Sequence, residues 1–197
     1  MSDAWRLTAK GTALADRRPY TEGQNLTTYA LITADGKTAV LERKFDAVKT
    51  KICFEIKYLP KTASDDIALS LTSGRKTVLT LRDSGKALLH GEQCLREHHV
   101  NVWQTLRMEA SLASGKALIK LNGKKCGEVP LAEGVKKADG IRLAFTAPNG
   151  GVLKFTDIFV FEMQPEPADY VPEPILPKKK DYYVGMNICS LWRNGDH

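Results

Sequence analysis

No stretch of this 197-residue sequence approaches the roughly 18 consecutive apolar residues that a membrane-spanning helix needs. The first residues, Met1 to Leu7, contain no basic region followed by an apolar core, so no secretory signal is visible. Both absences favour a cytoplasmic chain over a secreted one and predict no membrane partner. Hydrophobic residues make up 43% and charged residues 26% of the sequence, which are values typical of a folded globular protein.

The cysteines are few and lie far apart. Cys53, Cys94, Cys126 and Cys189 form no C-x-x-C pair and no cysteine–histidine pair at ligand spacing, so no zinc and no other cofactor is predicted. Cys53 lies inside an apolar strand pattern and is interpreted as a small core residue. Free thiols are typical of a reducing compartment, although the sequence alone leaves a disulfide open.

Positive charge is in excess but is not concentrated. The chain has 29 Lys and Arg against 23 Asp and Glu, a net charge of +6. Apart from the run Lys178–Lys180, basic residues are mixed with acidic ones along the sequence. Nucleic-acid-binding proteins gather their cations on one face, so this distribution favours a solvated surface and predicts no nucleic-acid partner.

Helical patterning is scarce as well. Residues 92–99 and 132–137 could each form a turn or two, but neither has a sustained apolar stripe. Apolar and polar residues alternate instead from Trp5 to Glu162, the period of half-buried strands. In residues 51–59 this alternation places four large apolar side chains on one face: Ile52, Phe54, Ile56 and Tyr58.

Turn residues separate these runs at strand-length intervals. Asn122-Gly123 is the pair that type I′ hairpin turns favour, and Asp83–Gly85 ends another run in the same way. About a dozen short strands with tight turns and almost no helix predict two packed antiparallel sheets. The predicted fold class is therefore an all-β sandwich.

Three motifs indicate which sandwich it is. A strand with the pattern W-x-x-L begins at Trp103, the next strand ends at the Asn122-Gly123 turn, and the closing strand contains Phe155-Thr-Asp-Ile-Phe-Val160. This order resembles the second half of concanavalin-like, laminin-G-like jelly rolls. The resemblance covers roughly residues 5–163 and implies a jelly roll over residues 1–163.

Many jelly rolls of this type are glycosidases, which place acidic residues as E-x-D-x-x-E or E-x-D-x-E on one strand face. No such pattern occurs here. Asp157 and Glu162 are five residues apart and would face opposite sides of a regular strand. The sandwich itself is therefore predicted to be non-catalytic. The resemblance also raises a structural calcium ion, but no loop dense in Asp and Asn supports one.

A sugar-binding face would combine exposed aromatic rings with polar groups. Tyr20, Tyr29 and Arg107 are the candidates for it, whereas Trp5 and Trp103 lie in alternating strand patterns and are expected in the core.

The adjacent pair His98-His99 would point to opposite faces of a strand and could not share a ligand. A surface histidine, or one with its hydrogen bonds satisfied within the protein, is the favoured interpretation of each.

The C-terminal part differs in composition. Five of the nine prolines lie between Pro165 and Pro177, so residues 164–180 are predicted to form an extended linker. Residues 181–197 resemble the first strand of a (β/α)₈ barrel and the loop after it, as found in multidomain bacterial glycoside hydrolases with an N-terminal jelly roll. In that case Trp192 and His197 belong to the edge of a barrel active site. The alternative is an extra strand docked on the sandwich.

The leading functional hypothesis is a non-catalytic accessory module that binds a polysaccharide or oligosaccharide, or positions a following catalytic domain of a glycoside hydrolase. The second is a structural or protein-interaction sandwich without affinity for glycans. An independent glycoside hydrolase is the least favoured because no acid pair is placed for it.

Overall fold

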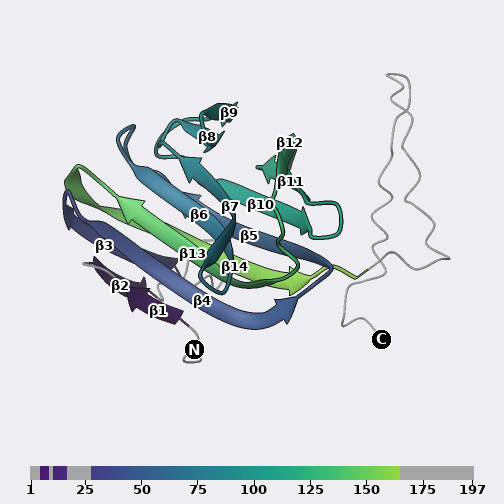
Figure 1. The fold of residues 1–197 in the computed structure, drawn as a ribbon. Coiled ribbons are helices and arrows are strands. Elements are labelled where there is room, and N and C mark those ends of the chain that lie inside the picture. The colour runs from purple at the N-terminus through teal and green to yellow at the C-terminus, as the bar shows by residue number, and fades with distance from the viewer. Residues whose placement is uncertain (1–4, 9–10, 17–27, 165–197) are drawn as a thin grey trace, which may run out of the picture. The chain divides into compact units, whose positions relative to one another are not determined.

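Two antiparallel sheets of seven strands each pack into a sandwich (Figure 1). The computed structural model describes residues 5–8, 11–16 and 28–164, and these contain no helix. In order across the first sheet, sheet A, the strands are β1 (Trp5–Thr8), β4 (Thr38–Val48), β13 (Ala138–Thr146), β6 (Asp66–Ser73), β7 (Lys76–Asp83), β8 (Ala87–His90) and β9 (Gln93–Glu97). Across the second, sheet B, they are β12 (Lys124–Pro130), β11 (Lys116–Leu121), β10 (Gln104–Ser111), β5 (Lys51–Leu59), β14 (Asn149–Glu162), β3 (Thr28–Asp35) and β2 (Gly11–Asp16).

The all-β sandwich expected from the sequence is thus confirmed. Because no helix is present among the described residues, none could cross a membrane. Neither segment that could have formed a helical turn or two is helical. Residues 92–99 contain strand β9, and residues 132–137 form an irregular connection with a turn at its centre.

The core lies between the sheets and follows the alternation of each strand. On β5 the predicted inward face is confirmed, since Ile52, Phe54, Ile56 and Tyr58 are all at most 3% exposed. β13 and β6 supply the facing layer, for example Phe145. Each fully buried aliphatic or aromatic side chain contributes roughly 1.5–3 kcal/mol of hydrophobic free energy. Because every second residue of these strands must be buried, a shift of one residue in the pairing would expose the core, and this fixes the register of the strands.

Both predicted hairpins are present. At the β11–β12 turn, Asn122 and Gly123 have φ values of +51° and +73°, as a type I′ turn requires. Its Asn122 side chain accepts a hydrogen bond from the amide of Thr105 at 2.8 Å, which ties the turn to the start of β10. The hairpin between β7 and β8 turns through Gly85, whose φ is +79°.

The chain divides into one compact unit from Met1 to Gln164 and another from Pro165 to His197. The predicted linker at 164–180 lies outside the described residues except for Gln164, and the segment 181–197 lies wholly outside them. Both assignments therefore stay predictions.

Candidate functional site

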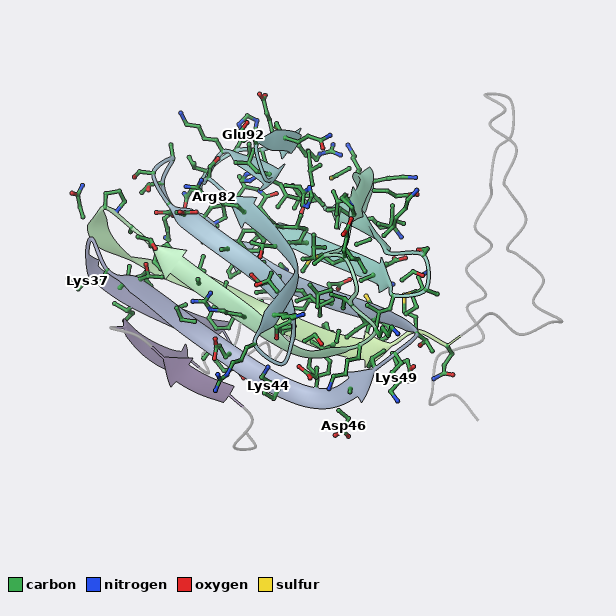
Figure 2. All side chains as sticks on the ribbon, in the orientation of Figure 1. Lys37, Lys44, Asp46, Lys49, Arg82 and Glu92 are labelled. Atoms are coloured by element: carbon green, nitrogen blue, oxygen red, sulfur yellow. The ribbon has the colours of Figure 1, made fainter. Side chains whose placement is uncertain are left out.

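The outward face of sheet A is polar and carries several ion pairs. Cross-strand ion pairs join Arg142 to Glu42 at 3.3 Å and Arg82 to Asp66 at 2.6 Å. The ammonium of Lys44 lies 3.5 Å from the carboxylate of Asp139, near the start of β13. Figure 2 shows Lys44 and Arg82 at the surface of this sheet. Such small, balanced surface pairs are typical of a solvated face.

The outward face of sheet B carries exposed aromatic rings. Phe159 is 52% exposed and Phe161 is 45% exposed, both on β14. Their orientation follows from a β-bulge: between Thr156 and Phe159 the register of β14 against β5 shifts by one residue. Before the bulge Phe155 points inward and is buried, and after it the odd-numbered phenylalanines point outward. The bulge therefore converts two apolar side chains of the closing strand into surface groups.

A row of side chains crosses sheet B beside these rings. In register, Phe159 lies opposite Glu55, Glu55 opposite Arg107, and Arg107 opposite Lys120. The neighbouring row places Phe161 opposite Cys53, which lies opposite Glu109 on β10. Directly paired residues point to the same face, so both rows stand on the outward surface.

Arg107 links the aromatic and the charged parts of this face. Its Nε donates to Glu109 Oε1 at 2.9 Å and its guanidinium also donates to Glu55 Oε2 at 3.3 Å. The guanidinium carbon lies 6.0 Å from the ring centre of Phe161, a cation–π distance. Lys120 Nζ donates to the same oxygen of Glu109 at 2.9 Å. We call Glu55, Arg107, Glu109, Lys120 and Phe161 the Arg107 cluster.

The electrostatics of the Arg107 cluster keep Glu109 ionised. Burial raises the pKa of Glu109, but hydrogen bonds from Lys120 and Arg107 lower it more, so the pKa lies below its ordinary value. A glycosidase acid needs a raised pKa, since it must carry a proton at neutral pH. Although Glu55 and Glu109 come together on one face, Glu109 is therefore not tuned to act as the catalytic acid.

Cys53 belongs by register to the outward row, yet its side chain is 0% exposed, so it is buried as the sequence predicted although it does not point into the core between the sheets. Burial raises the pKa of its thiol to about 11. Since the thiolate is the reactive form, Cys53 is an inert packing residue. Cys94 and Cys126 are likewise free thiols, and the fourth cysteine lies outside the described residues.

Trp103 differs from its expected place in the core. It lies just before β10 begins at Gln104 and is half-buried, with Lys57 Nζ 5.8 Å from its ring centre. The core positions of β10 are taken instead by the even-numbered residues, such as Leu106 and Met108. Trp103 is odd-numbered, like the outward-facing Arg107 and Glu109 of β10. The W-x-x-L spacing does not reveal this.

Tyr29, the other sugar-binding candidate whose side chain the structure describes, does not join Arg107. Tyr29 on β3 is half-buried, and its ring stacks on Phe155 with the centres 5.5 Å apart. Since Phe155 points inward, the Tyr29 ring packs against the core and not on the outward face. Four further side chains lie outside what the structure describes: those of Trp5, Tyr20, Trp192 and His197.

A second polar cluster crosses the core at one end of the sandwich. The Tyr58 hydroxyl donates to Asp83 Oδ2 at 2.5 Å, joining β5 of sheet B to β7 of sheet A. His98 Nε2 lies 2.9 Å from the same oxygen, and the amide of Gly85 donates to the other oxygen at 2.7 Å. Asp83 is 0% exposed and the His98 side chain 5%. This pairing confirms the interpretation of His98 as a satisfied histidine.

An open cavity of about 600 Å³ lies beside this cluster and is lined by Lys86, Ala87, Glu97, His98, His99 and Val100. His98 is its buried titratable group, but both ring nitrogens are engaged. Nε2 faces Asp83, and Nδ1 lies 3.3 Å from the carbonyl oxygen of His99. Two acceptors around one ring favour the doubly protonated imidazolium, so no nitrogen is left to act as a base.

His98 should make stability depend on pH. Burial lowers its pKa, but the hydrogen bond and charge of Asp83 raise it more, to a net value above 6.5. Because the folded-state pKa is raised, this stabilisation is complete below about pH 6.5 and is lost as pH rises through the folded-state pKa. Urea unfolding of the wild type should show this decline.

The same pH series on two variants checks the assignment. In His98→Gln the decline should disappear, whereas in His99→Gln, which alters the exposed neighbour, it should remain. A decline of equal size in the His98→Gln variant would contradict the assignment.

Among the residues that the structure describes, no group of three or more His, Cys, Asp or Glu side chains could hold a metal ion.

No protein-family model matches the sequence, and no curated protein matches it. Solved structures do match the fold. A sialidase superimposes with a TM-score of 0.60 at 10% sequence identity over 70% of this chain, which spans only 16% of the sialidase.

Two other matches cover more of the matched chain. The potassium-bound carbohydrate recognition domain of Emp46p has a TM-score of 0.50 at 12% identity, covering 80% of this chain and 88% of that domain. The alginate lyase from Corynebacterium sp. has a TM-score of 0.50 at 11% identity, covering 69% and 76%. Identities this low establish the fold alone. The described residues form a concanavalin-like jelly roll, as the strand motifs predicted.

Proposed function

We propose that this sandwich is a non-catalytic module that binds carbohydrate across the outward face of sheet B. The observation that carries the proposal is the pair of exposed rings, Phe159 and Phe161, beside the charged side chains of the Arg107 cluster. Sugar-binding faces combine aromatic surface with fixed polar groups, and this face offers both. The matched structures support the choice, since one is a carbohydrate recognition domain and two others carry the names of glycan-active enzymes.

The absence of catalysis rests on the state of the carboxylates. Glu109 is 7% exposed and bonded to two cations, so it cannot serve as the proton donor that glycoside cleavage needs. This state of Glu109 supports binding without turnover as the role of the face.

We further propose that the module serves a glycoside hydrolase domain joined through residues 164–180. The support is the barrel-like sequence pattern of residues 181–197, with Trp192 and His197 near a barrel site. Tyr20, in a loop-like part of the sequence, stays a predicted sugar contact.

Removing the exposed rings should weaken binding and leave folding intact. In affinity gels of the 197-residue chain with a panel of polysaccharides, Phe159→Ala and Phe161→Ala should each weaken affinity about tenfold, or 1.4 kcal/mol. Thermal unfolding should barely change, because both side chains are about half exposed.

Arg142→Gln on sheet A is the matched control and should bind as the wild type does. If no polysaccharide retards the chain, the carbohydrate proposal fails. The same exposed apolar surface then favours the second hypothesis, a protein-interaction module, because exposed apolar patches also mark protein interfaces.

A further inference from the structure

We infer that the carbohydrate bound by the outward face of sheet B is an acidic polysaccharide, an inference that rests on the proposed function. The reason is charge. Among the residues whose side chains the structure describes, seven cations and three carboxylates share this face by strand register. The cations are Lys51, Lys57, Arg107, Lys116, Lys120, Lys125 and Lys154, and the carboxylates are Glu55, Glu109 and Glu128.

All three carboxylates are already engaged by neighbouring cations. Glu109 accepts from Arg107 and Lys120 and has Lys51 at 3.8 Å. Glu55 pairs with Arg107 as well. Glu128, at the edge of the sheet, lies 3.5 Å from the ammonium of Lys125.

Three lysines of this face are not among the cations that pair with these carboxylates. No carboxylate whose side chain the structure describes forms an ion pair with Lys57, Lys116 or Lys154. Among the side chains that the structure describes, these ammonium groups leave an excess of positive charge on this face, which an acidic sugar would neutralise and a neutral one would not. Lys57 also lies over the Trp103 ring, which joins this charge to a half-buried aromatic.

The spread of these lysines suits a polymer. Lys154 is on β14 and Lys116 on β11, three strand positions apart, or about 14 Å. Along the strands they are separated by about eight residues of β5, from Leu59 to Lys51, or roughly 27 Å. Phe159 and Phe161 lie between them. A single sugar could not contact the whole face, whereas an extended chain could.

The outward face of sheet A supplies the contrast. Three cations whose side chains the structure describes there, Lys44, Arg82 and Arg142, are each paired with a carboxylate. The four exposed large hydrophobics of the described residues all lie elsewhere: Val102 just before β10, and Val152, Phe159 and Phe161 on β14. The excess charge and the aromatic surface therefore coincide on one side of the molecule.

The test compares polymers that differ only in charge. Polygalacturonate and its carboxyl-reduced form are one pair, and dextran sulfate and dextran are the other; oligo(dT) tests single-stranded nucleic acid. Affinities of the 197-residue chain are measured at about 50 and 200 mM salt, since screening weakens contacts between exposed charges. We expect at least one acidic polymer to bind about tenfold more tightly than its neutral partner and to weaken with salt.

Two triple variants with equal loss of charge separate this face from the net charge of the chain. Lys57→Gln/Lys116→Gln/Lys154→Gln should lose about tenfold in affinity for the acidic polymer and flatten its salt dependence. Lys44→Gln/Arg82→Gln/Arg142→Gln on sheet A should change neither. Equal losses in both variants would overturn the inference, because the binding would then follow net charge alone.

The remaining outcomes distinguish the two proposals. If each neutral polymer binds as tightly as its acidic partner and Phe161→Ala weakens both, the inference fails while the proposed function stands. If no glycan binds, the proposed function fails and the inference with it. Tighter binding of oligo(dT) than of any glycan would overturn the inference in favour of nucleic acid, which stacked rings and cations also suit.

Discussion

Asp83→Ala should lower the free energy of unfolding by about 3–5 kcal/mol, the loss expected when one partner of a buried ion pair is removed. The Asp83 carboxylate is fully buried and accepts hydrogen bonds from the Tyr58 hydroxyl and the Gly85 amide, with His98 at 2.9 Å. Without it, a buried imidazole and a buried phenol lose their acceptor together. Equilibrium urea denaturation of the 197-residue chain measures the loss.

Asp66→Ala is the matched control. Asp66 also pairs with a cation, Arg82, but at the exposed surface of sheet A, so its removal should cost at most about 1 kcal/mol. A double variant, Asp83→Asn/His98→Gln, should lose less than the sum of its single variants, because no unpaired charge remains. Equal losses for Asp83→Ala and Asp66→Ala would show that burial adds nothing to the pair.

The pKa of Tyr58 belongs to the same cluster. Burial raises it well above its ordinary value, and the neighbouring charge of Asp83 raises it further. The phenol therefore stays protonated and keeps donating to Asp83 throughout the range in which His98 titrates. Changes of stability between neutral and mildly alkaline pH can then be assigned to His98 and not to Tyr58.

The sequence predicted what local periodicity and turn chemistry determine. The alternation in β5 correctly placed Ile52 and Phe54 in the core, since a strand with one buried face has little freedom of register. Asn122-Gly123 was sufficient to predict a hairpin, because these residues accept the positive φ values that a type I′ turn needs.

The candidate site could not be predicted in full, because it depends on a feature that the alternation of apolar and polar residues does not show. Phe159 and Phe161 face outward only because a bulge after Thr156 shifts the register, and an uninterrupted strand pattern gives no sign of it. The same bulge removes the basis for expecting Asp157 and Glu162 on opposite faces, and the side chain of Asp157 lies outside what the structure describes. Of the predicted sugar contacts, Arg107 alone is brought to this face among the described residues.

Pairings across the sandwich were also beyond sequence reasoning. Asp83 ends a strand that looked like an ordinary hairpin arm, and its partner Tyr58 lies on the other sheet, 25 residues away. His98 drew attention because of its neighbour His99, yet its actual partner is Asp83, 15 residues away. Such contacts are set by the packing of two sheets, which no local window of residues contains.

Among the turns that the structure describes, Gly85→Ala should be the most disruptive addition of a single methyl group. A Cβ at Gly85 would lie 2.1 Å from the backbone oxygen of Thr62, far inside contact distance. Its φ of +79° adds strain of about 1–2 kcal/mol for a residue with a side chain. Overpacking adds typically 1–3 kcal/mol, so we expect a loss of about 2–5 kcal/mol in urea denaturation.

The neighbouring loop cannot yield easily, because Asp65 holds it. Its carboxylate accepts from the amides of Lys61 and Thr62 at 2.7 and 3.0 Å, and its own amide donates to the Thr62 oxygen that Gly85 faces. Asp65 is only 4% exposed, so moving this loop would uncover a buried carboxylate. The clash is with backbone, and truncating the Thr62 side chain would not relieve it.

Gly74→Ala separates the clash from the backbone strain. Gly74 has φ of +59° in the turn between β6 and β7, but an added Cβ there would meet no atom within 4 Å. It should therefore lose only the strain, about 1–2 kcal/mol. If the two variants lose the same free energy, the loop at Thr62 moves freely away from Gly85, and the close packing of residues 61–65 against the β7–β8 turn does not stabilise this end of the sandwich.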